Sequence, residues 1–227
     1  MKRNRSIGAI FALLIGLGTQ VCTAHAAGET FASPEKASRA LYQAVRDDNE
    51  QALTRILGAG NEFVSGDDPV QERREREQFA HKYDQMHRLV RASGGGTILY
   101  VGAENWPFPF PLVQESSAWH FDAKAGMEEV LARRVGENEF AAIAASRALI
   151  SRNDDDRPAP IDGYYFRRIP GQQTVVAYPA KYGVTGVMTF LAGPDNLVFE
   201  KDLGPNTAEA AKTIEQPDSL STWQRVE

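Results

Sequence analysis

The sequence predicts an α+β protein in which helices pack on antiparallel sheets in two halves. Two observations support this prediction: apolar residues at helical spacing open each half, and stretches of alternating apolar residues follow them. The start of the chain, with basic residues followed by an apolar run, has a different pattern from both halves. We therefore expect a signal peptide at 1–26, an α+β half at 27–125, and a helix with an antiparallel sheet at 126–227.

The first 26 residues have the three parts of a secretory signal peptide. Lys2, Arg3 and Arg5 precede an apolar run of about a dozen residues, which is too short to span a bilayer reliably. Ala24 and Ala26 then supply the small residues that a signal peptidase requires. We expect cleavage near Ala26 and a periplasmic or secreted protein without a stable membrane span; the alternative is an uncleaved anchor.

Loss of the signal peptide makes the chain more acidic. Lys+Arg falls from 25 to 22 while Asp+Glu stays at 30, which leaves a net charge of −8. Nucleic acids and anionic membrane surfaces attract basic proteins, so neither is the expected partner. The only cysteine, Cys22, leaves with the signal peptide, which excludes disulfides and thiol chemistry from the mature chain.

Three helices are predicted in the first half. The first follows Ser33 as N-cap and Pro34 at the first helical position, and the second covers "NEQALTRIL" up to the glycine at 58. The third is predicted over 69–91, with Phe79, Tyr83, Met86 and Val90 along one stripe and charges of alternating sign elsewhere.

Strands are predicted after these helices, beginning with "GGGTILYVG". In "ENWPFPFPLV", residues 104–113, an extended chain places three aromatic side chains on one face and three prolines along one edge: Trp106, Phe108, Phe110, Pro107, Pro109 and Pro111. Proline donates no backbone hydrogen bond, so we predict an edge strand with buried aromatic residues, paired in a hairpin with "WHFD". The alternative is an aromatic platform for a ligand.

The second half is predicted to begin with two helices and continue as a sheet. Met127, Leu131 and Val135 form one stripe, whereas Phe140, Ile143 and Ala144 lie half a turn away, so we expect a break at Gly136 with Asn138 as a new N-cap. Four strands are predicted in "GYYFRRI", "TVVAYP", "VTGVMTFL" and "NLVFEKDLG", followed by a short helix and a terminal extended segment.

No motif in the sequence specifies a reaction. The sequence contains neither a set of residues at metal-ligand spacing nor a nucleophile motif. We therefore expect no cofactor, no metal and no catalytic residue. The remaining alternative is a small-ligand-binding or hydrolytic cavity in the first half. Tyr83, Trp106 and Trp119 would line that cavity, and His87 or His120 would serve as the acid–base group.

Several segments resemble the bacterial family called domain of unknown function 2950. They are "FASPEKASRALYQAVR", "SGDDPVQERRERE", "WPFPFPLV", "WHFDAKAGMEEVLARRVGENE", "GYYFRR" and "VAYPAKYGVTGVMTFL…FEKDLGPNT". The resemblance implies an exported protein of diderm bacteria without an assigned activity. This chain has a shortened segment at 149–162, before the "GYYF" strand.

Two further likenesses concern the fold. The first half is similar to α+β domains of the nuclear-transport-factor-2 type, and the second half is similar to the globular head of type IV pilins. Fold alone does not determine function. We expect an exported envelope protein that is non-catalytic and acts as a protein-binding or assembly factor, with a protein partner in the cell envelope.

Overall fold

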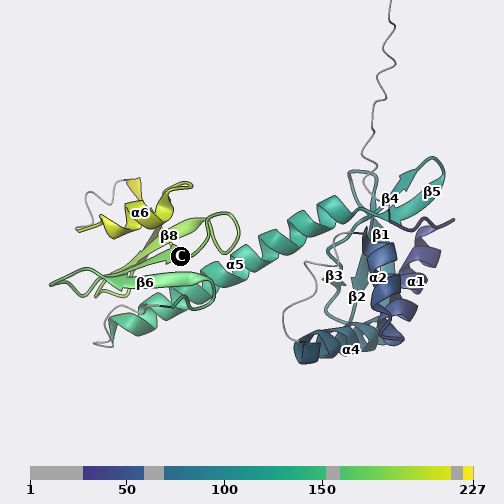
Figure 1. Cartoon of the computed structure of the whole chain (residues 1–227), viewed down its shortest axis with the longest axis horizontal. Coiled ribbons are helices and arrows are strands. Elements are labelled where there is room, and N and C mark those ends of the chain that lie inside the picture. The colour runs from purple at the N-terminus through teal and green to yellow at the C-terminus, as the bar shows by residue number, and fades with distance from the viewer. Residues whose placement is uncertain (1–27, 59–68, 152–158, 216–221, 227) are drawn as a thin grey trace, which may run out of the picture.

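The computed structural model consists of two lobes joined by one long helix (Figure 1). It describes residues 28–58, 69–151, 159–215 and 222–226. The expected signal peptide lies outside these ranges. Each lobe combines helices with a five-stranded antiparallel sheet, so the predicted α+β class is confirmed. Within the described ranges, none of the helices has the length and apolar character needed to span a membrane.

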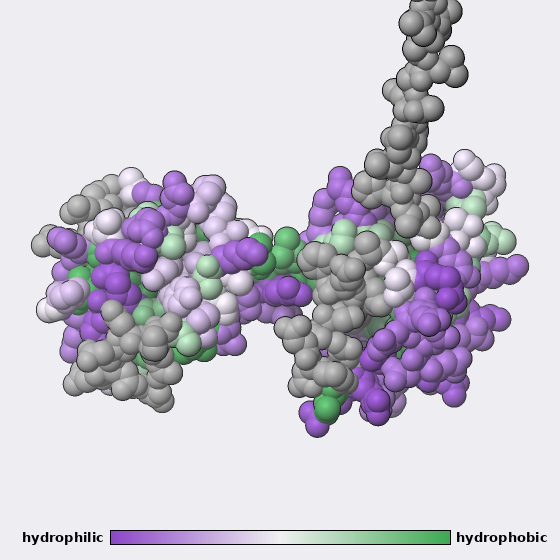
Figure 2. Space-filling model, in the orientation of Figure 1, coloured by the Kyte–Doolittle hydropathy of each residue, from purple (hydrophilic) through white to green (hydrophobic). Residues whose placement is uncertain are grey.

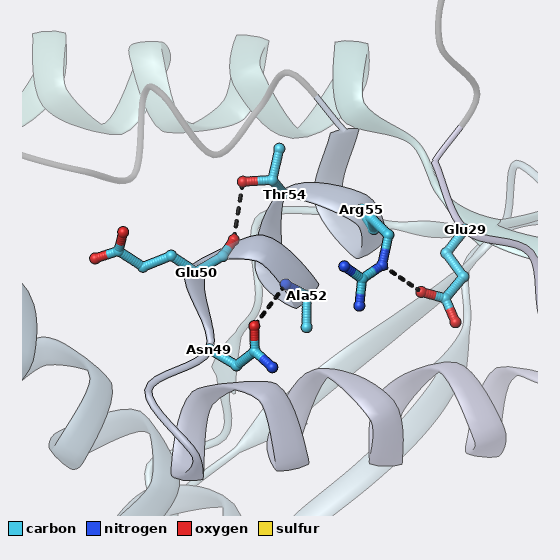
Figure 3. Close-up of polar contacts among 6 residues, drawn as sticks. All are labelled: Glu29, Asn49, Glu50, Ala52, Thr54 and Arg55. Carbon is cyan, nitrogen blue, oxygen red and sulfur yellow. Dashed lines mark hydrogen bonds and ion pairs between the residues drawn. The ribbon is translucent and has the colours of Figure 1, made fainter.

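Three helices precede the sheet of the N-lobe: α1 (Pro34–Arg46), α2 (Glu50–Leu57) and α4 (Pro69–Gln85). Ser33 caps α1 as predicted, because its side chain accepts a hydrogen bond from the N–H of Lys36 at 3.3 Å. Asn49 caps α2 in the same way through the N–H of Ala52 at 3.0 Å (Figure 3).

The first described residues run along α2 toward the sheet. Glu29 donates its N–H to the carbonyl of Arg55, and its carboxylate lies 3.8 Å from the Arg55 guanidinium (Figure 3). Phe31 then exchanges two backbone hydrogen bonds with Trp119, each 2.7 Å long. Phe31 therefore pairs with the outer edge of the sheet and leaves less of it open.

The N-lobe sheet has the order β1-β2-β4-β5, with β3 also paired to β2. Its strands are β1 (His87–Arg91), β2 (Thr97–Val101), β3 (Trp106–Pro107), β4 (Leu112–Glu115) and β5 (Ala118–Phe121). The helices cover one face of this sheet, where Leu41 and Ile56 pack with Leu99, Leu112 and Phe121.

The predicted third helix is wrong beyond Gln85. Residues 87–91 form β1 instead and pair with β2 from His87↔Val101 to Arg91↔Thr97. This pairing gives the backbone of both strands its hydrogen bonds and turns Leu89 toward the core. Pairing with a neighbouring strand therefore determines the structure of residues 87–91, although their sequence has a helical pattern.

The proline segment is not one strand. The segment pairs with β2 through two separate strands, β3 and β4. Between them, the four residues 108–111 lie opposite two residues of β2, Ile98 and Leu99. The chain bulges there because the prolines donate no hydrogen bonds, and the bulge turns Phe110 into the core. The predicted hairpin is confirmed for β4 with β5, where Leu112 pairs with Phe121.

The C-lobe has the sheet order β10-β9-β8-β7-β6. The four strands predicted in this part are confirmed as β6 (Tyr164–Arg168), β7 (Val175–Pro179), β8 (Met188–Ala192) and β9 (Val198–Asp202). The short helix is α6 (Thr207–Lys212), and the terminal segment adds β10 (Gln224–Arg225). One face of the sheet packs on α5 and the other on α6 (Figure 1).

Helix α5 (Ala123–Ile150) is continuous over 28 residues, so the predicted break at Gly136 is wrong. The two apolar stripes belong to two faces of one helix. Gly126 and Val130 face the N-lobe core, whereas Ala142, Ser146 and Leu149 are buried against the C-lobe sheet. The lobes therefore pack on different faces of α5, whereas Phe140 and Ala144 of the second predicted stripe are exposed.

The N-lobe is attached to α5 by the bulged proline segment. The ring of Phe110 packs so closely on Gly126 that a Cβ atom there would collide with it. Two turns further on, the Arg133 guanidinium donates a hydrogen bond of 2.9 Å to the carbonyl of Pro107 and lies 5.3 Å from the centre of the Trp106 ring. The free edge of β3 is therefore occupied by an α5 side chain.

The C-lobe is attached to α5 by the loop that leads into β8. One carboxylate oxygen of Glu139 accepts the N–H groups of Val187 at 2.9 Å and Met188 at 3.0 Å. Asn138 donates to the carbonyl of Thr185 at 2.9 Å. Beside them, burial raises the pKa of Tyr164, which donates its hydroxyl to the carbonyl of Met188 and keeps its proton.

We expect Gly136→Ala to stabilise the protein by about 0.5–1 kcal/mol, because alanine restricts the unfolded chain and favours a helix. A Cβ atom at Gly136 has no atom within 4 Å. Gly126→Ala is the matched contrast and should cost about 1–3 kcal/mol through its collision with Phe110. Urea unfolding measures both. Destabilisation by Gly136→Ala would contradict a continuous α5.

We expect Glu139→Ala to lower the free energy of unfolding by about 2–3 kcal/mol, because the N–H groups of Val187 and Met188 lose their acceptor. Glu139→Gln keeps an acceptor oxygen and should cost about 1 kcal/mol. Glu128→Ala, on an exposed part of α5, is the control and should change stability by less than about 0.5 kcal/mol. Equal effects of all three substitutions would exclude this attachment.

Candidate functional site

The second half of α5 carries an exposed apolar surface. Phe140 is 77% exposed, and Ala144 and Ala148 follow it at intervals of four residues on the same side of the helix. We call these three residues, with Glu137 and Arg147 at their flanks, the outer face of α5. Figure 2 shows that hydrophobic residues also reach the surface where α5 runs between the lobes.

Both lobes leave the outer face uncovered for a geometric reason. The C-lobe packs on the opposite side of the helix, where Ala142, Ser146 and Leu149 are buried. The N-lobe packs on the same side as the outer face, but its attachment at Pro107 reaches only to Arg133. Phe140 therefore lies on the N-lobe side of α5, about two turns beyond the point where the N-lobe ends.

The charges that flank Phe140 have no partner within the described chain. Glu137 is exposed, and neither it nor Arg147 makes an ion pair with another described residue. The Nε atom of Arg147 is buried and lacks a hydrogen-bond partner among the described residues. The outer face thus combines a large apolar side chain with one acid and one base that make no ion pair among the described residues.

A second exposed aromatic residue, Trp106, lies on β3 of the N-lobe. It is 37% exposed, so its predicted burial is wrong, whereas Phe108 is partly buried and Phe110 is fully buried. Trp106 stays at the surface because β3 is at the edge of the sheet and the indole packs on Arg133. Phe140, Trp106 and Val70 are the large hydrophobic side chains that the described chain leaves exposed.

Two of the candidate ligand-binding residues, Tyr83 and His87, are in contact. Their rings are stacked with centroids 3.9 Å apart, and the Tyr42 ring is also stacked on Tyr83, with centroids 4.3 Å apart. The Tyr83 hydroxyl shares a buried hydrogen bond of 3.0 Å with Ser38. Tyr42 donates to Asp84, and this hydrogen bond raises the pKa of Tyr42. The stack connects α1, α4 and β1.

The hydrogen bonds of His87 determine the position of its proton. Its Nδ1 atom lies 2.9 Å from the carbonyl oxygen of Tyr83, and a carbonyl can only accept a hydrogen bond. The neutral ring therefore carries its hydrogen on Nδ1 and presents an unprotonated Nε2. Within the described residues, no cluster of three His, Cys, Asp or Glu side chains is placed to hold a metal ion.

The other three candidates are distributed over the sheet. Trp106 on β3 and His87 on β1 both pair with Val101 of β2, which lies between them. Because neighbouring strands are about 5 Å apart, the backbones of Trp106 and His87 are separated by about 10 Å. Trp119 lies on β5 at the opposite edge, paired with Phe31. His120 alternates with the buried Phe121 and therefore points to the face away from the helices.

The outer face was missed in the sequence because an exposed phenylalanine has the same pattern as a buried one. The pattern places Phe140 in one apolar stripe with Ile143 and Ala144 and does not show whether that stripe is buried. One signal did single it out: Phe140 is half a turn away from the stripe of Met127, Leu131 and Val135. In an unbroken helix, that offset places Phe140 on another face.

Comparison with known proteins assigns the chain to a family. The sequence pattern of the family described as Protein of unknown function (DUF2950) matches residues 28–157 and 166–226. No protein with a curated description matches the chain, and no solved structure does. The likenesses to nuclear transport factor 2 and to pilin heads therefore stay predictions. The family match extends through both lobes and α5, and the chain belongs to the DUF2950 family.

Proposed function

We propose that this protein is an exported, non-catalytic assembly factor that binds a protein partner of the cell envelope through the outer face of α5. The observation that carries the proposal is the 77% exposure of Phe140 in the middle of a long helix. An exposed apolar patch rimmed by polar side chains is typical of protein-binding surfaces, and aromatic residues at its centre contribute much of the binding energy. Ala144 and Ala148 allow a partner to approach the helix closely.

The charge and the first residues of the chain support export and a protein partner. The sequence from 1 to 26 has the parts of a cleavable signal, and the remaining chain carries a net charge of −8. An acidic protein is repelled by nucleic acids and anionic lipids, which leaves proteins as the favoured partners. We propose that residues 27–125 and 126–227 form the two halves of the mature protein, in the periplasm or outside the cell.

We place partner binding ahead of the ligand-binding alternative for a geometric reason. A cavity in the first half would require Tyr83, Trp106 and Trp119 to converge with a histidine. Trp106 and Trp119 lie on strands at different places in the sheet, and His120 faces away from the helices. The stack of Tyr83 and His87 is also explained by the packing of α4 on β1.

We expect Phe140→Ser to abolish capture of the partner, because it removes the apolar centre of the outer face. Full-length protein with a C-terminal tag is expressed in its own type of cell, crosslinked in intact cells and purified. Val70→Ser, which changes another exposed apolar residue on α4, is the matched control and should capture the partner as well as the wild type does.

Equal capture by Phe140→Ser and the wild type would exclude the outer face as the binding surface. The same preparation tests export through the intact mass of the tagged protein. The mass should correspond to a chain that begins at Ala27. A mass that includes residues 1–26 would contradict cleavage. Turnover of an envelope substrate that is lost on His87→Ala or His120→Ala would contradict a non-catalytic function.

A further inference from the structure

The outer face of α5 is complementary to itself. We propose that its partner is a second copy of this chain, packed antiparallel against α5 around a two-fold axis beside Ala142. This inference rests on the proposed function and names the partner of the same surface. It follows from the sizes of the side chains along the outer face, from their charges and from the positions of the lobes.

The side chains along the outer face alternate between large and small. An axis beside Ala142 places Phe140 of one chain opposite Ala144 of the second copy, and the two-fold symmetry repeats this contact. The large ring of Phe140 fits beside the small side chains of Ala144 and Ala148, as a knob fits a hole between packed helices. Both copies then bury the aromatic ring that each exposes alone.

The same register pairs the charges that have no partner within the described chain. It places Glu137 of one copy opposite Arg147 of the other, again twice. Ion pairs at a surface contribute only about 0–1 kcal/mol each, so these pairs serve to select the antiparallel register. A parallel arrangement would instead bring Glu137 next to Glu137 and Arg147 next to Arg147, which is unfavourable.

The lobes leave room for this arrangement. On the outer-face side, the N-lobe is attached to α5 as far as Arg133. The proposed axis places Arg133 opposite residue 151 of the second copy, one residue past the end of its α5 at Ile150. Each N-lobe therefore lies beyond the end of the other copy's helix, and each C-lobe lies on the far side of its own α5 (Figure 1).

Sedimentation equilibrium of the mature chain purified from the periplasm tests the proposal. We expect a dimer for the wild type, and we expect Phe140→Glu to raise its Kd by roughly thirtyfold or more, as the loss of a central aromatic contact does. Glu137→Arg and Arg147→Glu should each weaken the dimer. The double variant Glu137→Arg with Arg147→Glu should restore it, and this rescue excludes loss of folding as the cause.

Single cysteines test the orientation, because the mature chain has none of its own. Across the proposed axis, the two copies of residue 141 are about 3 Å apart along the helix, whereas the two copies of residue 148 are about 18 Å apart. We expect Ala141→Cys to form a disulfide-linked dimer under mild oxidation and Ala148→Cys to remain unlinked. Equal linking at both positions would exclude the antiparallel arrangement.

A monomer at all concentrations, or a dimer that Phe140→Glu leaves unchanged, would overturn the proposal. These outcomes are distinct from a failure of the proposed function. If the wild type is monomeric but Phe140-dependent capture of a different envelope protein persists, the second copy is excluded and partner binding by the outer face stands. If Phe140 affects neither self-association nor capture, both proposals fail.

Discussion

The continuity of α5 is the constraint on which the rest of the structure depends. At 1.5 Å per residue, its 28 residues span about 42 Å, enough to support two separate lobes. The lobes attach on different faces: Arg133 holds the proline segment of the N-lobe, and Glu139 holds the loop that leads into β8. Because each lobe covers only part of one face, the outer face around Phe140 stays exposed.

Two segments of the family resemblance form these attachments to α5. The first is "WPFP", residues 106–109, in which the carbonyl of Pro107 accepts a hydrogen bond from Arg133. Phe110, which follows this motif directly, packs on Gly126. In "YGVTGVMTF", Val187 and Met188 donate to Glu139, and a side chain on Gly186 would collide with Tyr164. Both motifs therefore contribute contacts that hold the two lobes on one helix.

The sequence was sufficient for most elements but not for the relations between them. Alternating patterns correctly predicted β6 to β9, and the cap at Ser33 correctly predicted where the first helix begins. The predicted break at Gly136 was wrong because two apolar stripes half a turn apart need not both be buried: α5 is continuous, and Phe140 and Ala144 are exposed on it. His87 was assigned to a helix because its strand is stabilised by pairing with β2, which a local pattern cannot show. The half-turn offset of Phe140 places it on another face of α5, but whether that face is covered depends on the extent of the N-lobe, which the local sequence does not show.

The distance between the two ends of α5 tests this account most directly. Spin labels on Lys124→Cys and Ala148→Cys, in labelled protein diluted with unlabelled protein, report that distance within one chain by double electron–electron resonance. Both positions are exposed, and the 24 residues between them should give one narrow distribution near about 36 Å. A short or broad distribution would show that α5 bends or breaks near Gly136, and it would contradict a rigid helix that holds the lobes on opposite faces.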